Sequence, residues 1–115
     1  MNKVNLELVD LVENIEGLER LCGSRDVPVE SGYVSDLLSD VMRNAAGRSA
    51  WVTIQHHENV IAVALMAEVS VVIFSNGLRP EEDVIRRAEE EDQAICTYEG
   101  SSFELVGKLY QLGLR

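Results

Sequence analysis

The chain has 115 residues, of which 46% are hydrophobic, and its formal net charge is −10. This length and apolar content suit one folded domain with its own core and exclude disorder as the main state. The acidic excess repels phosphate backbones and anionic lipid, so neither nucleic acid nor a membrane is expected as a partner. No apolar run approaches the roughly 20 residues that span a bilayer, and the first residues lack the pattern of a signal peptide. We therefore expect a cytoplasmic protein.

The first 30 residues predict one helix followed by short edge elements. Apolar residues recur at spacings of three and four between residues 5 and 15, which predicts an amphipathic helix that stops near Gly17. Residues 18–22 predict a short edge strand, and residues 23–26 a turn. Residues 27–29 are expected to be extended and to lie at an edge, because Pro28 cannot donate a hydrogen bond to a central strand.

From Ser35 onward the pattern alternates between helix and strand. Ser35 is expected to cap a helix with Asp36 in its first turn, and residues 51–54 predict the next strand. Residues 60–67 are apolar almost all round, which predicts a helix buried on much of its circumference and leaves a second subunit as one candidate for its cover. Residues 69–74 are an apolar run typical of the centre of a parallel sheet.

The remaining elements complete the alternation. Pro80 suits the first turn of a helix, residues 94–97 predict a short strand, and Ser101 with Glu104 forms a capping box that opens the last helix. Such alternation predicts an α/β fold, a single domain in three layers with a mainly parallel sheet and helices on both faces. The apolar residues of the last helix are expected to cover the core: Phe103, Leu105, Val106, Leu109, Tyr110 and Leu112.

Three polar turns follow predicted strands, at residues 55–59, 75–79 and 97–102. They should share one edge of the sheet, where open parallel sheets bind ligands, and each precedes a helix N-terminus that favours an anion. Asn76 and Gly77 also offer a backbone that allows close approach to a ligand. The competing interpretation is that these polar side chains only cap helices and meet water. The candidate ligand-binding residues are Gln55, His56, His57, Asn59, Ser75, Asn76 and Gly77.

Metal and catalytic sites are not expected. The adjacent His56 and His57 would project in different directions from an extended chain, and the sequence has neither HExxH spacing nor a second ligand cluster. No nucleophile elbow, Walker loop or GxGxxG run follows a strand, so no catalytic residue and no cofactor is predicted. Cys22 and Cys96 belong to no CxxC unit and are interpreted as small buried hydrophobic residues.

Four segments resemble the DRTGG domain family, and more specifically the small stand-alone proteins made of that domain alone. They are GYVSDLLSDVM (residues 32–42), WVTIQHHENVIAVA (51–64), IFSNGLRP (73–80) and SSFELVGKLYQLGL (101–114). The resemblance implies one DRTGG-like domain over residues 1–115, similar in its α/β fold to the amino-terminal domains of HPr kinase/phosphorylase and of Mur ligases. The family occurs as an accessory module in some phosphate acetyltransferases and between CBS domains in some inorganic pyrophosphatases. It therefore implies a non-catalytic regulatory module, a homodimer that senses a nucleotide or another small metabolite.

The sequence departs from the pattern that names the family. Gln55, His56 and His57 stand where the family typically has Gly-Asp-Arg, and Ser75-Asn76-Gly77 stands where it has Thr-Gly-Gly. These changes remove a cation and a backbone-only glycine, so a neutral ligand, or one read by imidazole, is easier to accommodate than an anion. The alternative function is a protein-interaction adaptor that regulates a separate enzyme or kinase in trans, with the acidic residues 81–92 steering it to a basic partner.

Overall fold

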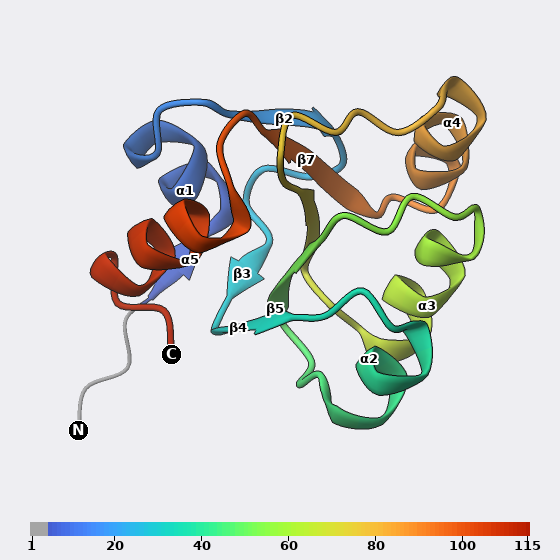
Figure 1. Cartoon of the computed structure of the whole chain (residues 1–115), viewed down its shortest axis with the longest axis horizontal. Helices are drawn as coiled ribbons and strands as arrows, with labels where there is room; N and C mark the ends of the chain where they lie inside the picture. The colour runs from blue at the N-terminus through green and yellow to red at the C-terminus, as the bar shows by residue number, and fades with distance from the viewer. Residues whose placement is uncertain (1–4) are drawn as a thin grey trace.

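The computed structural model describes residues 5–115 as an α/β fold in which helices cover both faces of a central sheet (Figure 1). The described residues contain five helices: α1 (Leu8–Asn14), α2 (Leu38–Asn44), α3 (Asn59–Ala67), α4 (Glu82–Glu90) and α5 (Ser102–Gln111). The strands are β1 (Leu6–Glu7), β2 (Leu18–Cys22), β3 (Pro28–Val29), β4 (Ser31–Val34), β5 (Ser49–Thr53), β6 (Val71–Phe74) and β7 (Ala94–Tyr98). Within this part of the chain, no helix is both long enough and apolar enough to cross a bilayer.

The main sheet has five strands in the order β2-β7-β6-β5-β4. Strands β4 to β7 are parallel, and β2 joins β7 antiparallel at one edge. The central strand is β6, and all four of its residues are buried, which confirms the prediction made from its apolar run. β1 and β3 form a separate two-stranded sheet.

The two faces of the sheet have separate cores. Trp51 packs in a cluster with α2, α3 and α4, whereas its neighbour Val52 packs in a cluster with α1 and α5. Strands β4, β5, β6 and β7 follow one another across the sheet in the order of the chain. Because each connection is a right-handed crossover in the same direction, the connecting helices α2, α3 and α4 lie on one face. The helix after β7 lies on the opposite face, as the left and right sides of Figure 1 show. The predicted three-layer α/β arrangement is therefore confirmed.

Three expectations for the first half of the chain need correction. The first helix begins at Leu8, because Leu6 and Glu7 pair with β3 instead of extending the helix. β4 was not predicted, and its pairing with β5 makes it the second edge of the main sheet. Ser35 does not cap α2, whose N-cap is Leu37; the Ser35 hydroxyl accepts a hydrogen bond from the Leu37 amide at 3.2 Å.

The second half of the chain follows the predictions more closely. Ser101 caps α5 by accepting a hydrogen bond from the Glu104 amide at 3.1 Å. Pro80 lies before α4, whose N-cap is Glu81, so it is not in the first helical turn. Two residues of the expected core are exposed instead: Phe103 by 91% and Tyr110 by 57%.

Candidate functional site

The carboxyl ends of the parallel strands meet at one edge of the sheet, as the strand order requires. Along this edge the turn after β5 lies beside the turn after β6, which in turn lies beside the turn after β7. The Ser75 amide donates to the Thr53 carbonyl at 3.2 Å and so joins the ends of β6 and β5. The three polar turns expected to share an edge therefore do share it.

Backbone hydrogen bonds join the turn after β6 to the turn after β7. The Asn76 amide donates to the Gly100 carbonyl at 2.7 Å, and the Gly77 amide donates to the Tyr98 carbonyl at 2.8 Å. The hydroxyls of Ser75 and Ser102 lie 2.5 Å apart. Asn76 and Gly77 both have left-handed backbones, with φ of 61° and 69°. Their amides are therefore committed within the protein and do not form a cradle for a phosphate.

These bonds lie where the connections diverge to opposite faces of the sheet. The turn after β6 leads to α4 on one face, and the turn after β7 leads to α5 on the other. In open parallel sheets such a divergence leaves a crevice that binds ligands. Here two backbone hydrogen bonds join the turns directly, and a cavity of about 300 Å³ lies beside the turn after β7, lined by Glu16, Tyr98, Glu99, Gly100, Glu104 and Lys108.

The turn after β5 is held by its own polar side chains. The Gln55 side-chain carbonyl accepts from the His57 amide at 3.1 Å, and His57 Nδ1 accepts from the Asn59 amide at 3.1 Å. An imidazole that accepts at Nδ1 in its neutral form carries its proton on Nε2. The exposed His57 ring therefore presents an N–H donor at the start of α3.

Asp36 is a polar residue at this edge that the sequence placed on a helix. One oxygen of its carboxylate accepts from the Thr53 hydroxyl and from the Ile54 amide, each at 2.8 Å. The sequence offers no signal for this role, because the pattern predicts no strand directly before Asp36 and places Asp36 in the first turn of a helix. A fixed carboxylate here disfavours an anionic ligand at the neighbouring turn.

The seven predicted binding residues thus fall into two neighbouring groups. Gln55, His57 and Asn59 are linked by hydrogen bonds in one turn, and the exposed His56 belongs to the same turn. Ser75, Asn76 and Gly77 form the next turn, and only Ser75 of these three is buried. Asn59 also lines a cavity of about 270 Å³ between α3 and α4, with Glu58, Asp83, Val84 and Arg87. Within residues 5–115, no three His, Cys, Asp or Glu side chains are grouped so as to hold a metal ion.

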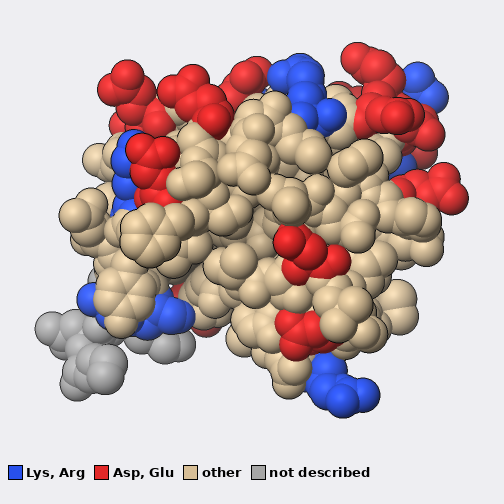
Figure 2. Space-filling model, in the orientation of Figure 1, with Lys and Arg blue, Asp and Glu red and all other residues tan. Residues whose placement is uncertain are grey.

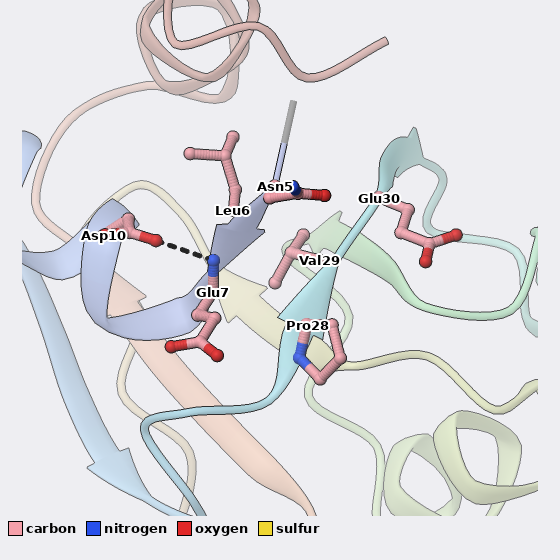
Figure 3. Close-up of a pocket in the computed structure, with 7 residues that line it drawn as sticks. All are labelled: Asn5, Leu6, Glu7, Asp10, Pro28, Val29 and Glu30. Atoms are coloured by element: carbon pink, nitrogen blue, oxygen red, sulfur yellow. Dashed lines mark hydrogen bonds between the residues drawn. The ribbon is translucent and has the colours of Figure 1, made fainter. Parts of the chain in front are cut away.

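A larger cavity of about 330 Å³ lies against the two-stranded sheet of β1 and β3, away from this edge (Figure 3). Asp10 accepts a hydrogen bond there from the Glu7 amide at 2.8 Å, which closes the capping box of α1. The acidic groups of this cavity therefore include one that is already used to start a helix. Its lining residues are Asn5, Leu6, Glu7, Asp10, Pro28, Val29 and Glu30.

Comparison with known proteins gives a match among solved structures. No family model matches the chain, and no curated protein sequence matches it. Among solved structures, the chain is similar to the CBS and DRTGG domains of the regulatory region of Clostridium perfringens pyrophosphatase, crystallised with the activator diadenosine tetraphosphate. The TM-score is 0.71 at 15% sequence identity, over 91% of this chain and 45% of that chain.

The chain has a DRTGG-like fold. At 15% identity the similarity concerns the fold alone, and this chain spans less than half of the regulatory region that it matches. The DRTGG-like fold implied by the sequence is therefore confirmed, while the roles of individual residues rest on their geometry in this structure.

Proposed function

We propose that this chain is a non-catalytic regulatory module that binds a nucleoside-containing metabolite and acts as a homodimer. The observation that carries the proposal is its fold, which over 91% of the chain matches a regulatory region crystallised with a nucleotide activator. A regulatory module needs only to bind its ligand more tightly in one conformation than in another. It needs no nucleophile or acid–base pair, and His57 Nδ1 is already used as an acceptor for the Asn59 amide.

The binding site of this proposal is the pair of turns after β5 and β6. Their exposed side chains offer an imidazole N–H from His57 and an amide from Asn76. Nucleobases carry donors and acceptors on their edges and a flat face that stacks on rings such as imidazole. The amides of Asn76 and Gly77 are committed to the next turn, and Asp36 adds a fixed negative charge. We therefore expect the protein to recognise the ligand through its base, with the phosphates directed to solvent.

Binding by the purified protein tests this proposal, with calorimetry and thermal unfolding as the measurements. The probes are diadenosine tetraphosphate, adenosine and inorganic tripolyphosphate. The two adenosine compounds should bind and raise the melting temperature, because a ligand at a hundredfold excess over its dissociation constant stabilises the folded state by about 2.7 kcal/mol. Tripolyphosphate should have no effect. A protein that binds none of the three, or tripolyphosphate alone, would contradict the proposal.

Two variants locate the site without disturbing the backbone. Asn76→Gly removes the side-chain amide and keeps a residue that adopts φ of 61° readily. His57→Asn removes the ring and keeps a side-chain acceptor for the start of α3. Both should weaken adenosine binding. Asn44→Ala, an exposed amide at the end of α2, is the matched control and should bind as the unaltered protein does.

A further inference from the structure

Helix α3 begins with a cap that a histidine side chain supplies. His57 Nδ1 accepts a hydrogen bond from the Asn59 amide at 3.1 Å, and the His57 carbonyl accepts one from the Val60 amide at 3.0 Å. Within residues 5–115, Glu58 makes no side-chain capping bond to α3, and the first turn of this helix has no acidic residue. The imidazole is therefore the side chain that satisfies an amide at this helix end.

This cap differs in its chemistry from the cap of α5. There the Ser101 hydroxyl accepts from the Glu104 amide at 3.1 Å, and a hydroxyl keeps its lone pairs throughout the physiological range of pH. An imidazole nitrogen accepts only while the ring is neutral, because both nitrogens of the charged ring carry protons. Histidine is the side chain that ordinarily changes charge between about pH 5 and pH 8. The cap of α3 therefore exists in only one protonation state.

We propose that protonation of His57 releases the first turn of α3 and so makes ligand binding at the turns after β5 and β6 sensitive to pH. In the charged ring, the Nδ1–H and the Asn59 N–H point at each other, and two donors cannot share a hydrogen bond. A positive charge at a helix N-terminus is also unfavourable, because the helix dipole places partial positive charge there. The charged ring therefore leaves the Asn59 amide and the position that the neutral ring holds.

The release is confined to one step of the turn. The Gln55 side-chain carbonyl accepts from the His57 amide at 3.1 Å, and the Thr53 hydroxyl accepts from the Gln55 amide at 2.9 Å. Amides and hydroxyls do not change charge in mild acid, so these bonds persist. The chain stays fixed as far as His57, while the step from His57 to Asn59 becomes free. Asn59 borders the cavity between α3 and α4, so the change reaches that cavity as well.

Charged side chains around the turn favour the charged ring. Asp36 is held at the end of β5 by its hydrogen bonds, and Glu58 and Asp83 line the cavity next to the turn together with Arg87. Figure 2 shows acidic side chains gathered along the upper rim of the molecule, where α4 lies, and the net charge is −10. Carboxylates attract an imidazolium, whereas Arg87 and a charged His56 repel it. The carboxylates are in excess, so mild acid is enough to charge the ring.

This inference adds regulation to the proposed site, and its ligand-binding part rests on the proposed function. The release of the cap is measured without a ligand, so the two can fail separately. Adenosine is the suitable ligand probe because it is uncharged. The phosphates of diadenosine tetraphosphate would be attracted by a charged ring, and this attraction would oppose the effect of the released turn.

Nuclear magnetic resonance of the isotope-labelled whole chain tests the cap directly. A scalar coupling through the hydrogen bond should join the Asn59 amide nitrogen to His57 Nδ1 at about pH 8 and should be lost at about pH 5. His56→Asn is the matched control, since it removes the adjacent exposed ring and should leave both results unchanged. A coupling that persists at the lower pH, or that is absent at the higher one, would overturn the proposal.

Stability and affinity should follow the same protonation. His57→Asn keeps an acceptor at every pH, so relative to this variant the unaltered protein should lose about fivefold in its folding equilibrium from about pH 8 to pH 5, the usual effect of a helix cap. The adenosine dissociation constant of the unaltered protein and of His56→Asn should rise about fivefold over that interval, as the binding-competent fraction falls. Equal stability changes in His57→Asn and the unaltered protein would overturn the proposal, as would an adenosine affinity that does not depend on pH. A protein that binds no adenosine at either pH would contradict the proposed function, and the coupling and the unfolding would still decide whether His57 is the switch.

Discussion

The carboxylate of Asp36 accepts a hydrogen bond from the Thr53 hydroxyl at 2.8 Å, which ties the segment after β4 to the end of β5. The same oxygen accepts from the Ile54 amide, and the Trp51 indole donates to the Ser35 carbonyl at 2.8 Å. Thr53 is 1% exposed, so its hydroxyl needs a partner within the protein. These contacts fix the chain where it leaves the edge strand and place a negative charge beside the candidate site.

Removing the Asp36 carboxylate should destabilise the protein. Asp36→Ala leaves the buried Thr53 hydroxyl without its acceptor, and we expect a loss of about 1–3 kcal/mol in the free energy of unfolding. Thr53→Val replaces the hydroxyl by a methyl group of similar size. In a double-mutant cycle measured by urea unfolding, the two changes should be coupled by about 1 kcal/mol. Strictly additive effects would show that the hydrogen bond contributes nothing to stability.

A second carboxylate should make stability depend on acid pH. Hydrogen bonds from Ser35, Asn44 and Tyr33 lower the pKa of Asp40 below its usual value of 3.8. A depressed pKa in the folded state stabilises the fold above the unfolded-state pKa, and this stability is lost as the pH falls through the folded-state value. We therefore expect the free energy of unfolding, measured with urea, to decrease between about pH 5 and pH 2. The decrease should be less steep for Asp40→Asn than for the unaltered protein.

The change in stability at alkaline pH depends on Tyr33. Its hydroxyl donates to both carboxylate oxygens of Asp40 at 2.9 Å, and this hydrogen bond to Asp40 raises the pKa of Tyr33 above 10.0. A raised pKa gives stability that is present below the unfolded-state value and is lost as the pH rises through the folded-state value. Asp40→Asn should therefore flatten the alkaline limb as well. An unchanged profile on both sides would show that the pair has no energetic role.

The alternation of helices and strands from Ser35 onward was readable because each strand is an apolar run and each helix has a period near 3.6. β4 was missed because it is an edge strand with mixed burial, and Gly32 weakens its pattern. Leu6 and Glu7 fit a helical period, but in the structure they pair with β3 as a short strand. The local sequence pattern does not predict this pairing, because the partner strand lies about 20 residues further along the chain.

The sequence predicts where the candidate site lies but not which of its polar groups are free to contact a ligand. Polar turns after strands indicate the edge of a parallel sheet, and the three turns do lie there. The sequence does not show that the Asn76 and Gly77 amides bond to the next turn, since those bonds depend on the packing of residues 98–100. Phe103 and Tyr110 were predicted in the core but are exposed, because an apolar residue on a helix looks the same in the sequence whether it faces the sheet or solvent.

Two glycines should respond in opposite ways to the same substitution. Gly23 has φ of +91°, and a Cβ there would overlap backbone atoms of Ala94, so Gly23→Ala should cost about 2 kcal/mol or more. Gly107 is helical with open space around it, so Gly107→Ala should stabilise the fold by about 1 kcal/mol. Urea unfolding measures both. Similar effects at the two positions would contradict the distinction between a constrained glycine and an unconstrained one.

The two cysteines should be protected from alkylation while the protein is folded. Burial raises the pKa of Cys96 to about 12, and burial followed by the charge of Glu89 raises the pKa of Cys22. At pH 8 only about one Cys96 side chain in ten thousand is then a thiolate, the form that reacts.

Iodoacetamide followed by mass spectrometry should therefore label the native protein slowly and modify both thiols at once in guanidinium. Cys22 lies on the edge strand β2, where its sulfur is 3.5 Å from the Gln93 carbonyl, so it should react before Cys96, which lies on β7 inside the sheet. Local opening of an edge strand requires less free energy than opening of the core. Labelling of Cys96 first would mean that the sheet opens between β7 and β6 rather than at β2. The hydrogen-bonded turns after β6 and β7 would then be the less stable end of the molecule.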